Sequence, residues 1–266
     1  MKTMPLRRSP RGAFLPTRLI ATTVLSLFFV ACIMPTSSHA QPLSQTVTPP
    51  LEARDLPAQA LFNEAVAFER EGKGIEKAAA RYDEVMHRFG RAPTSGSRQF
   101  AARALLNKGA LLHRSALHNK GGSLEERNEM TKDAIITFER IERNFGNEKS
   151  LPIRVVLASA LASKAEALYR LGEAEKTLAA YNQLERNFGN EKSEDIRVVL
   201  ASALVSKAET LHRMGEKKKT LATYDQLAQQ FGKDNNDFIK RLTNIAKWRA
   251  IEIRRSNNNM VLSSRP

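Results

Sequence analysis

Residues 143–150 of the chain read RNFGNEKS, and the same eight letters recur as residues 186–193. The match extends without a gap from residues 142–184 to residues 185–227, with 33 identities in 43 positions. A duplication with a period of about 40 residues is typical of stacked helical arrays, in which each unit covers the apolar face of its neighbour. This repeat decides the fold class.

A Phe-Gly pair closes each unit and divides the rest of the chain. The pairs are Phe89-Gly90, Phe145-Gly146, Phe188-Gly189 and Phe231-Gly232. The last three lie 43 residues apart, whereas the first interval is 56, so 13 extra residues fall within the second unit, around residues 119–122. The four predicted units and the helix that caps them cover about residues 59–90, 98–146, 153–189, 196–232 and 237–255.

Each unit is expected to contain two amphipathic helices. In the third unit the spacing of apolar residues predicts a first helix over residues 153–171, which ends at Gly172. A second helix should begin near Glu173, and we expect Gly189 to end it as a left-handed C-cap. The apolar stripe of this second helix is Leu178, Tyr181, Leu184 and Phe188.

Two helices should depart from the common unit. Ser123 and Glu126 have the spacing of a capping box, so the second helix of the enlarged unit should begin near Leu124 and be longer. In the closing helix, Trp248 is interpreted as a core residue, with an exposed self-association contact as the alternative.

The composition agrees with a helical protein. Hydrophobic residues make up 42% of the chain but aromatic residues only 6%, and Ala, Leu, Glu, Lys and Arg dominate. Strand-rich folds are therefore disfavoured. We predict an all-α protein, an α-solenoid of four stacked helix-turn-helix repeats with a C-terminal capping helix.

Over about residues 61–232 the units resemble the tetratricopeptide repeat (TPR) family. The third unit matches the family at the small residue of the first helix, the apolar residue three positions later, the turn glycine and the aromatic of the second helix. These residues are Ala165, Leu168, Gly172 and Tyr181. The units are similar to a bacterial variant with a Tyr-Asp pair in the second helix, but at 43 residues they exceed the family's ~34. The resemblance implies a superhelix whose first helices line a peptide-binding groove.

Two rows of cations recur on these first helices. A row of cations along a groove would suit an acidic segment or a C-terminal carboxylate. The alternative is that arginine near a helix C-terminus complements the macrodipole and needs no ligand. The near-identical units also differ at two groove positions, Ala162 against Val205 and Tyr169 against His212. The candidate groove residues are Arg70, Lys108, His113, Arg114, Lys164, Tyr169, Arg170, Lys207, His212 and Arg213.

The sequence contains no motif for catalysis or cofactor binding. The glycines are placed as helix stops and do not form a phosphate-binding loop. His113 and His118 are five residues apart, which is poor spacing for holding one metal ion on a helical face. We expect the histidines outside the first forty residues to lie on the surface near helix ends. The chain is therefore expected to be no enzyme and to need no cofactor or metal.

The first forty residues have the layout of a secretory signal peptide. Basic residues precede a 16-residue apolar run, shorter than the ~20 residues that span a bilayer, and cleavage is expected between Ala40 and Gln41. An extended linker over residues 41–58 should follow, and residues 256–266 should form a disordered tail. The alternative is a lipoprotein anchored through Cys32, because residues 29–32 resemble a lipobox.

The distribution of charge narrows the choice of partner. Of the formal net charge of +14, +5 lies in residues 1–40 and +5 from Lys233 onward, so the core lacks a strongly basic face. Nucleic acid is therefore not an expected partner. The sequence favours an exported scaffold or adaptor, periplasmic or secreted, that binds an unidentified protein or peptide segment in the concave face of the superhelix. An acidic segment is one alternative for this ligand. The alternative is an envelope assembly factor held at the membrane by Cys32 or by an uncleaved signal.

Overall fold

The computed structural model describes residues 53–72 and 74–263 of the chain. The predictions for Cys32, Ala40 and Gln41 lie outside these residues, as does most of the predicted linker. Within the described part, all regular structure is helical. The elements are η1 (Ala53–Asp55), α2 (Leu56–Arg70), α3 (Ile75–Phe89), α4 (Ser95–His118), α5 (Leu124–Phe145), α6 (Leu151–Arg170), α7 (Ala174–Phe188), α8 (Glu194–Arg213), α9 (Lys217–Phe231) and α10 (Asp237–Ser263).

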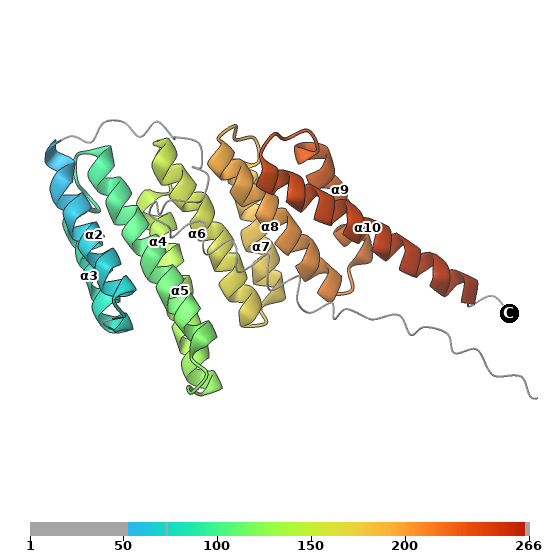
Figure 1. The fold of residues 1–266 in the computed structure, drawn as a ribbon, viewed down its shortest axis with the longest axis horizontal. Helices are drawn as coiled ribbons and strands as arrows, with labels where there is room; N and C mark the ends of the chain where they lie inside the picture. The colour runs from blue at the N-terminus through green and yellow to red at the C-terminus, as the bar shows by residue number, and fades with distance from the viewer. Residues whose placement is uncertain (1–52, 73, 264–266) are drawn as a thin grey trace, which may run out of the picture.

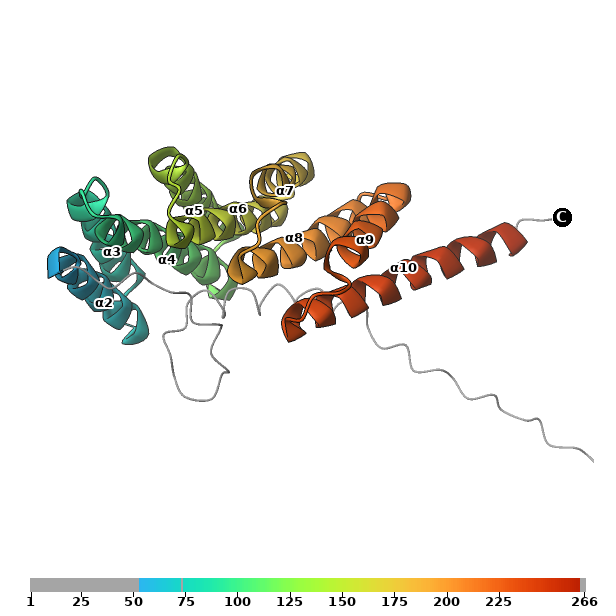
Figure 2. The ribbon, with the colours of Figure 1, turned by 90° about the horizontal axis from the view of Figure 1, so that it is seen from above.

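The α-helices form two layers in a curved array (Figures 1 and 2). Each helix packs against the next in the chain, and α2, α4, α6, α8 and α10 also pack against one another in turn. We call these five helices the inner layer, and α3, α5, α7 and α9 the outer layer. Outer helices are joined by long polar side chains, such as Gln183, which donates to Glu142 at 2.9 Å. Close inner packing and splayed outer helices place the inner layer on the concave side of the arch in Figure 2. The all-α prediction and the sequential packing of helices are confirmed.

The turn between α6 and α7 is a Schellman motif. Gly172 has φ +79°, the N–H of Glu173 donates to the carbonyl of Leu168 at 3.0 Å, and the N–H of Gly172 donates to that of Tyr169 at 3.0 Å. Gly215 repeats the same φ between α8 and α9. The positive φ makes glycine the favoured residue at both turns.

The prediction of a left-handed cap at Gly189 is wrong. Its φ is −56°, in the right-handed region. Glycine fits there for a different reason, because a Cβ at Gly189 would lie 2.5 Å from the carbonyl oxygen of Glu185.

Inner and outer helices fit together through small residues facing aromatic ones. A Cβ added to Gly109 in α4 would lie 2.5 Å from the ring of Phe138 in α5. Phe138 is fully buried, as is Tyr82 at the matching position of α3. Small Ala and Ser side chains also let inner helices approach each other closely, so residues 156–163 of α6 form an uninterrupted buried run.

The enlarged second pair has the predicted capping box. Ser123 Oγ accepts from the N–H of Glu126 at 3.1 Å, and Glu126 Oε2 accepts from the N–H of Ser123 at 2.9 Å. The helix begins at Leu124 and spans 22 residues, against 15 for α7. Since α4 is also long, the α4–α5 hairpin reaches beyond its neighbours in Figure 1.

The two ends of the described part depart from the predictions. Residues 56–58 were expected to be linker, but α2 begins at Leu56 with Pro57 in its first turn, where proline is tolerated. Residues 256–263 were expected to be disordered, yet α10 continues to Ser263, and no glycine or proline interrupts this stretch. Trp248 is 47% exposed, which corrects its interpretation as core.

Ion pairs link three inner helices, α4, α6 and α8, to the loop that precedes the next inner helix. The three pairs are Arg98–Glu148 (2.7 Å), Arg154–Glu191 and Arg197–Asp234 (2.6 Å). They repeat along one edge of the array. Asp234 is nearly buried, so its carboxylate depends on Arg197 for charge compensation.

The Arg197→Ala substitution should lower the free energy of unfolding by about 1–3 kcal/mol, because it leaves a nearly buried carboxylate without its cation. Urea denaturation followed by circular dichroism would measure this. Arg88→Ala, which removes an exposed i,i+4 pair with Glu84, should change it by less than about 0.5 kcal/mol. Equal losses for the two variants would contradict the role given to Asp234.

The Gly172→Ala substitution should cost about 1–2 kcal/mol, because alanine is strained at positive φ. Gly121→Ala is the matched control, since Gly121 has no positive φ and a Cβ there meets nothing within 4 Å. Thermal melting of the two variants compares them directly. A Gly172→Ala protein as stable as the Gly121→Ala protein would rule out the requirement for glycine at this turn.

Candidate binding surface

The predicted row of lysines is neutralised within the array. Each lysine lies on an inner helix and forms an ion pair with an acid on the preceding outer helix. The pairs are Lys108–Asp83 (2.5 Å), Lys164–Glu142 (3.1 Å) and Lys207–Glu185 (2.7 Å). The lysine side chains are only 14–19% exposed. These lysines connect neighbouring helix pairs and do not form a free cationic row.

The groove expected along the middle of the inner helices is closed. Ala162 and Val205, predicted to face it, are 7% and 4% exposed. The physical reason is the close packing of α6 against α4 and α8, which small side chains permit. Any binding surface on the concave side must therefore lie toward the ends of these helices.

The second row comprises Arg70, Arg114, Arg170 and Arg213, and two of these arginines reach back to the preceding inner helix. Arg114 Nη2 lies 2.5 Å from Glu69 Oε1, and the Arg213 guanidinium lies 5.2 Å from the ring centroid of Tyr169. Arg70 and Arg170 are exposed at the ends of α2 and α6, and neither forms an ion pair within the described residues. The sequence placed Arg70, Arg170 and Arg213 correctly at helix ends, whereas α4 continues beyond Arg114 to His118. The contacts with Glu69 and Tyr169 are visible only in the structure.

His113 departs from its prediction as a surface and groove residue. It is fully buried, with Nε2 3.8 Å from Glu166 Oε1 of α6. The matching residues Tyr169 and His212 lie in the last turn of their helices, whereas α4 continues for five residues beyond His113. The insertion thus converts an exposed helix end into an interior position.

A cluster of cations and rings remains open at the C-terminal ends of α6 and α8. We call it the basic edge, and it comprises Arg127, Tyr169, Arg170, His212 and Arg213. The pKa of Arg170 is lowered, chiefly because the guanidinium is partly buried. The Glu166 carboxylate acts in the opposite direction, and the nearby positive charge of Arg127 lowers the pKa further. Sequence reasoning missed Arg127, because it lies in the enlarged unit and has no counterpart in the duplicated pair.

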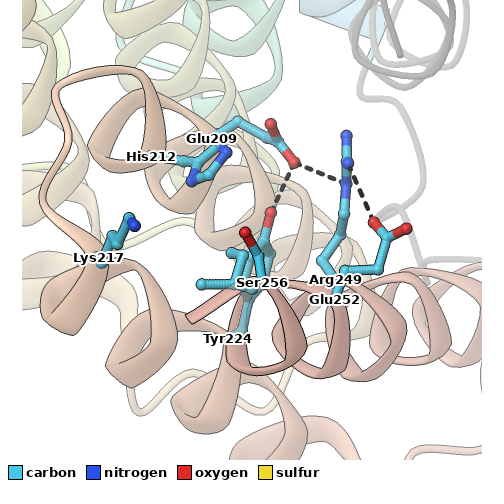
Figure 3. A pocket seen from close by; sticks show the side chains of 8 residues that line it. Glu209, His212, Lys217, Tyr224, Arg249, Glu252 and Ser256 are labelled. Atoms are coloured by element: carbon cyan, nitrogen blue, oxygen red, sulfur yellow. Dashed lines mark hydrogen bonds and ion pairs between the residues drawn. The ribbon is translucent and has the colours of Figure 1, made fainter. Parts of the chain in front are cut away.

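A pocket of about 230 Å³ lies beside this edge, between α8, α9 and α10 (Figure 3). Tyr224 Oη donates to Glu209 Oε1 at 2.6 Å, and Arg249 Nε lies 3.2 Å from the same oxygen. Burial, followed by the charge of Glu209, raises the pKa of Tyr224. His212 lines the rim, so the pocket adjoins the basic edge.

A matching arrangement lies at the other end of the array. Tyr82 Oη donates to Glu69 Oε2 at 2.6 Å, and Glu69 is also paired with Arg114. The Tyr224–Glu209–Arg249 group and the Tyr82–Glu69–Arg114 group each link an outer helix to two inner helices. Their role is therefore to hold the two layers together. The part of the chain that the structure describes contains no cluster of three or more His, Cys, Asp or Glu residues suited to a metal ion. It also contains no helix long and apolar enough to cross a bilayer.

Alkaline pH should destabilise the protein through its buried tyrosines. Burial raises the pKa of Tyr82, Tyr181 and Tyr224 above the ordinary value of 10.0. Their contribution to stability is complete below pH 10 and is lost as the pH rises above it, because the unfolded chain then releases phenolic protons that the folded chain retains. Urea unfolding at stepped alkaline pH, with tyrosinate absorbance followed in parallel, should show this fall. Tyr224→Phe should reduce its slope, and an unchanged slope would contradict the assignment.

A scan against protein-family models and a search of curated proteins both found no match to this chain. The contacts of the basic edge and of α10 are therefore the observations from which a function is proposed.

Proposed function

We propose that the chain is an exported scaffold of four TPR-like units, capped by α10, that binds an acidic segment of a partner protein along the basic edge. One observation carries this proposal. Each repeated lysine is paired with an acid of the array, whereas Arg170 and Arg213 of the basic edge form no ion pair within the described residues. Arginines that form no ion pair, with the partly exposed Tyr169 and the exposed His212 beside them, are suited to bind carboxylates.

The electrostatics of Arg170 favour an anionic ligand. Its guanidinium is partly withdrawn from water and lies near the like charge of Arg127, both of which lower its pKa. A carboxylate bound between the two arginines would relieve that repulsion and form charge-assisted hydrogen bonds. The helix dipole does not neutralise these arginines, because each helix C-terminus carries only about half an elementary negative charge.

The geometry of the edge suits an extended segment. Packed helices lie ~8–10 Å apart, and an extended chain advances ~3.3 Å per residue, so carboxylates three residues apart could reach α6 and α8 together. Tyr169 and His212 offer rings to the residues between them. A segment with an acidic residue at every third position is therefore the expected ligand.

Fluorescence anisotropy of the full chain with a labelled Glu-Ser-Gly repeat peptide tests the proposal. Arg170→Glu combined with Arg213→Glu should weaken binding at least tenfold, which corresponds to ~1.4 kcal/mol. Arg143→Glu combined with Arg186→Glu is the matched control, since these exposed arginines lie at the far ends of α5 and α7. Equal weakening by both pairs, or no binding by the unsubstituted chain, would refute the proposal.

A further inference from the structure

The helix α10 has the position of an inner helix, and the described residues contain no outer helix to follow it. It begins at Asp237, 43 residues after α8 begins at Glu194, which is the period of the duplicated unit. It packs against α9 and α8 as α8 packs against α7 and α6. Ile239 matches Ile196 in this register, and both are fully buried. No helix of the described residues follows α10 to cover it as α9 covers α8.

The face of α10 that an outer helix would cover is exposed. In α8 the positions Leu204 and Ala208 are buried. One period later stand Lys247, which is exposed, and Ile251, which is 46% exposed. Ile251 and Trp248 form an exposed apolar patch, and Lys247 is one of the charges beside it.

The C-terminal half of α10 extends away from the rest of the array. Both views show it reaching past α8 and α9 (Figures 1 and 2). The helix has 27 residues, against 20 in α8, and among its residues up to Ser256 the last buried side chain is Ala250. A helix in water gains most of its stability from packing of an apolar face. A partner along this half would supply that packing.

The charges on this face of α10 indicate the charge of the helix that would bind there. Arg241, Lys247 and Arg255 are exposed around the patch and form no ion pair within the described residues, whereas Arg254 is paired with Asp225 at 2.8 Å. Pairing α10 with α10 of a second copy would bring these cations together. Acidic side chains on the occupant would instead neutralise them.

We propose that α10 docks an acidic amphipathic helix of a partner protein. Its apolar residues pack on Trp248 and Ile251, and its carboxylates lie beside Arg241, Lys247 and Arg255. The docked helix lies where an outer helix lies in the complete pairs, but in a different register. In complete pairs a small residue admits an aromatic ring, as Gly109 admits Phe138, and the larger Ile251 requires an aliphatic side chain opposite it.

Trp248 is the only tryptophan in the chain, so its emission reports on this surface alone. Addition of a synthetic Leu/Glu amphipathic helical peptide to the full chain should shift the emission to the blue and protect it from acrylamide. The same peptide with Lys in place of Glu should do neither. The absence of a blue shift with the Glu peptide, or an equal shift with the Lys peptide, overturns the proposal.

Substitutions locate the site and separate it from the basic edge. Lys247→Glu with Arg255→Glu should raise the dissociation constant at least tenfold, whereas Arg143→Glu with Arg186→Glu should leave it unchanged. The Arg170→Glu/Arg213→Glu protein should retain the Trp248 response, even if the basic edge binds nothing. Loss of the response in that protein would overturn docking on α10 without deciding the function of the edge.

An apolar substitution pair tests the patch itself. Ile251→Glu should abolish the response, and Leu151→Glu is its matched control because the next unit carries Glu194 at that position. Both sites are exposed, so circular dichroism should show intact helices. A blue shift produced by phosphatidylglycerol vesicles but not by the Glu peptide would assign the surface to a membrane. A shift that grows with protein concentration alone, with dimers in sedimentation, would assign it to a second copy. Either result overturns the proposal.

Discussion

The array depends on fitting a large aromatic side chain of each outer helix against a small residue of the inner helix. Gly109 and Phe138 show how tight this fit is, since even a Cβ on Gly109 would lie 2.5 Å from the ring. Burial of an aromatic side chain is worth several kcal/mol, which makes this contact a large contribution at each pair. Small side chains also let the inner helices pack closely against one another, which buries the predicted groove positions Ala162 and Val205.

A closed groove changes which charges are available for binding. The lysines that recur on the inner helices, and the arginines at the starts of α4, α6 and α8, pair with acids of neighbouring elements. Such partly exposed pairs add little net stability, but they disfavour a slipped register, because a slip would leave nearly buried charges unpaired. Exposed cations outside these pairs gather at the basic edge and along the exposed face of α10.

Much of the fold could be predicted from the repeat, and much of the site could not. Helix order, the capping box at Ser123 and the turn at Gly172 follow from spacing and local chemistry, which the sequence records directly. The sign of φ at Gly189 does not, because glycine accepts both hands and the path of the following loop decides between them. The partners of Lys164 and Lys207 lie 22 residues away on another helix, so spacing within one helix could not identify them. The burial of His113 follows from an insertion whose path the repeat does not specify.

The terminal helix α10 exposes both apolar side chains and cations, and this combination indicates a binding surface. A terminal helix that served only as a cap would present a polar outer face to water. Trp248 and Ile251 on α10 do not fit that role, and the cations around them do not fit burial against a further unit of the same chain. His212 belongs to the basic edge and also lines the pocket beneath α10, so the two surfaces adjoin. One acidic partner whose helix lies on α10 and whose adjoining extended segment crosses α8 and α6 would satisfy both sets of unpaired cations at once.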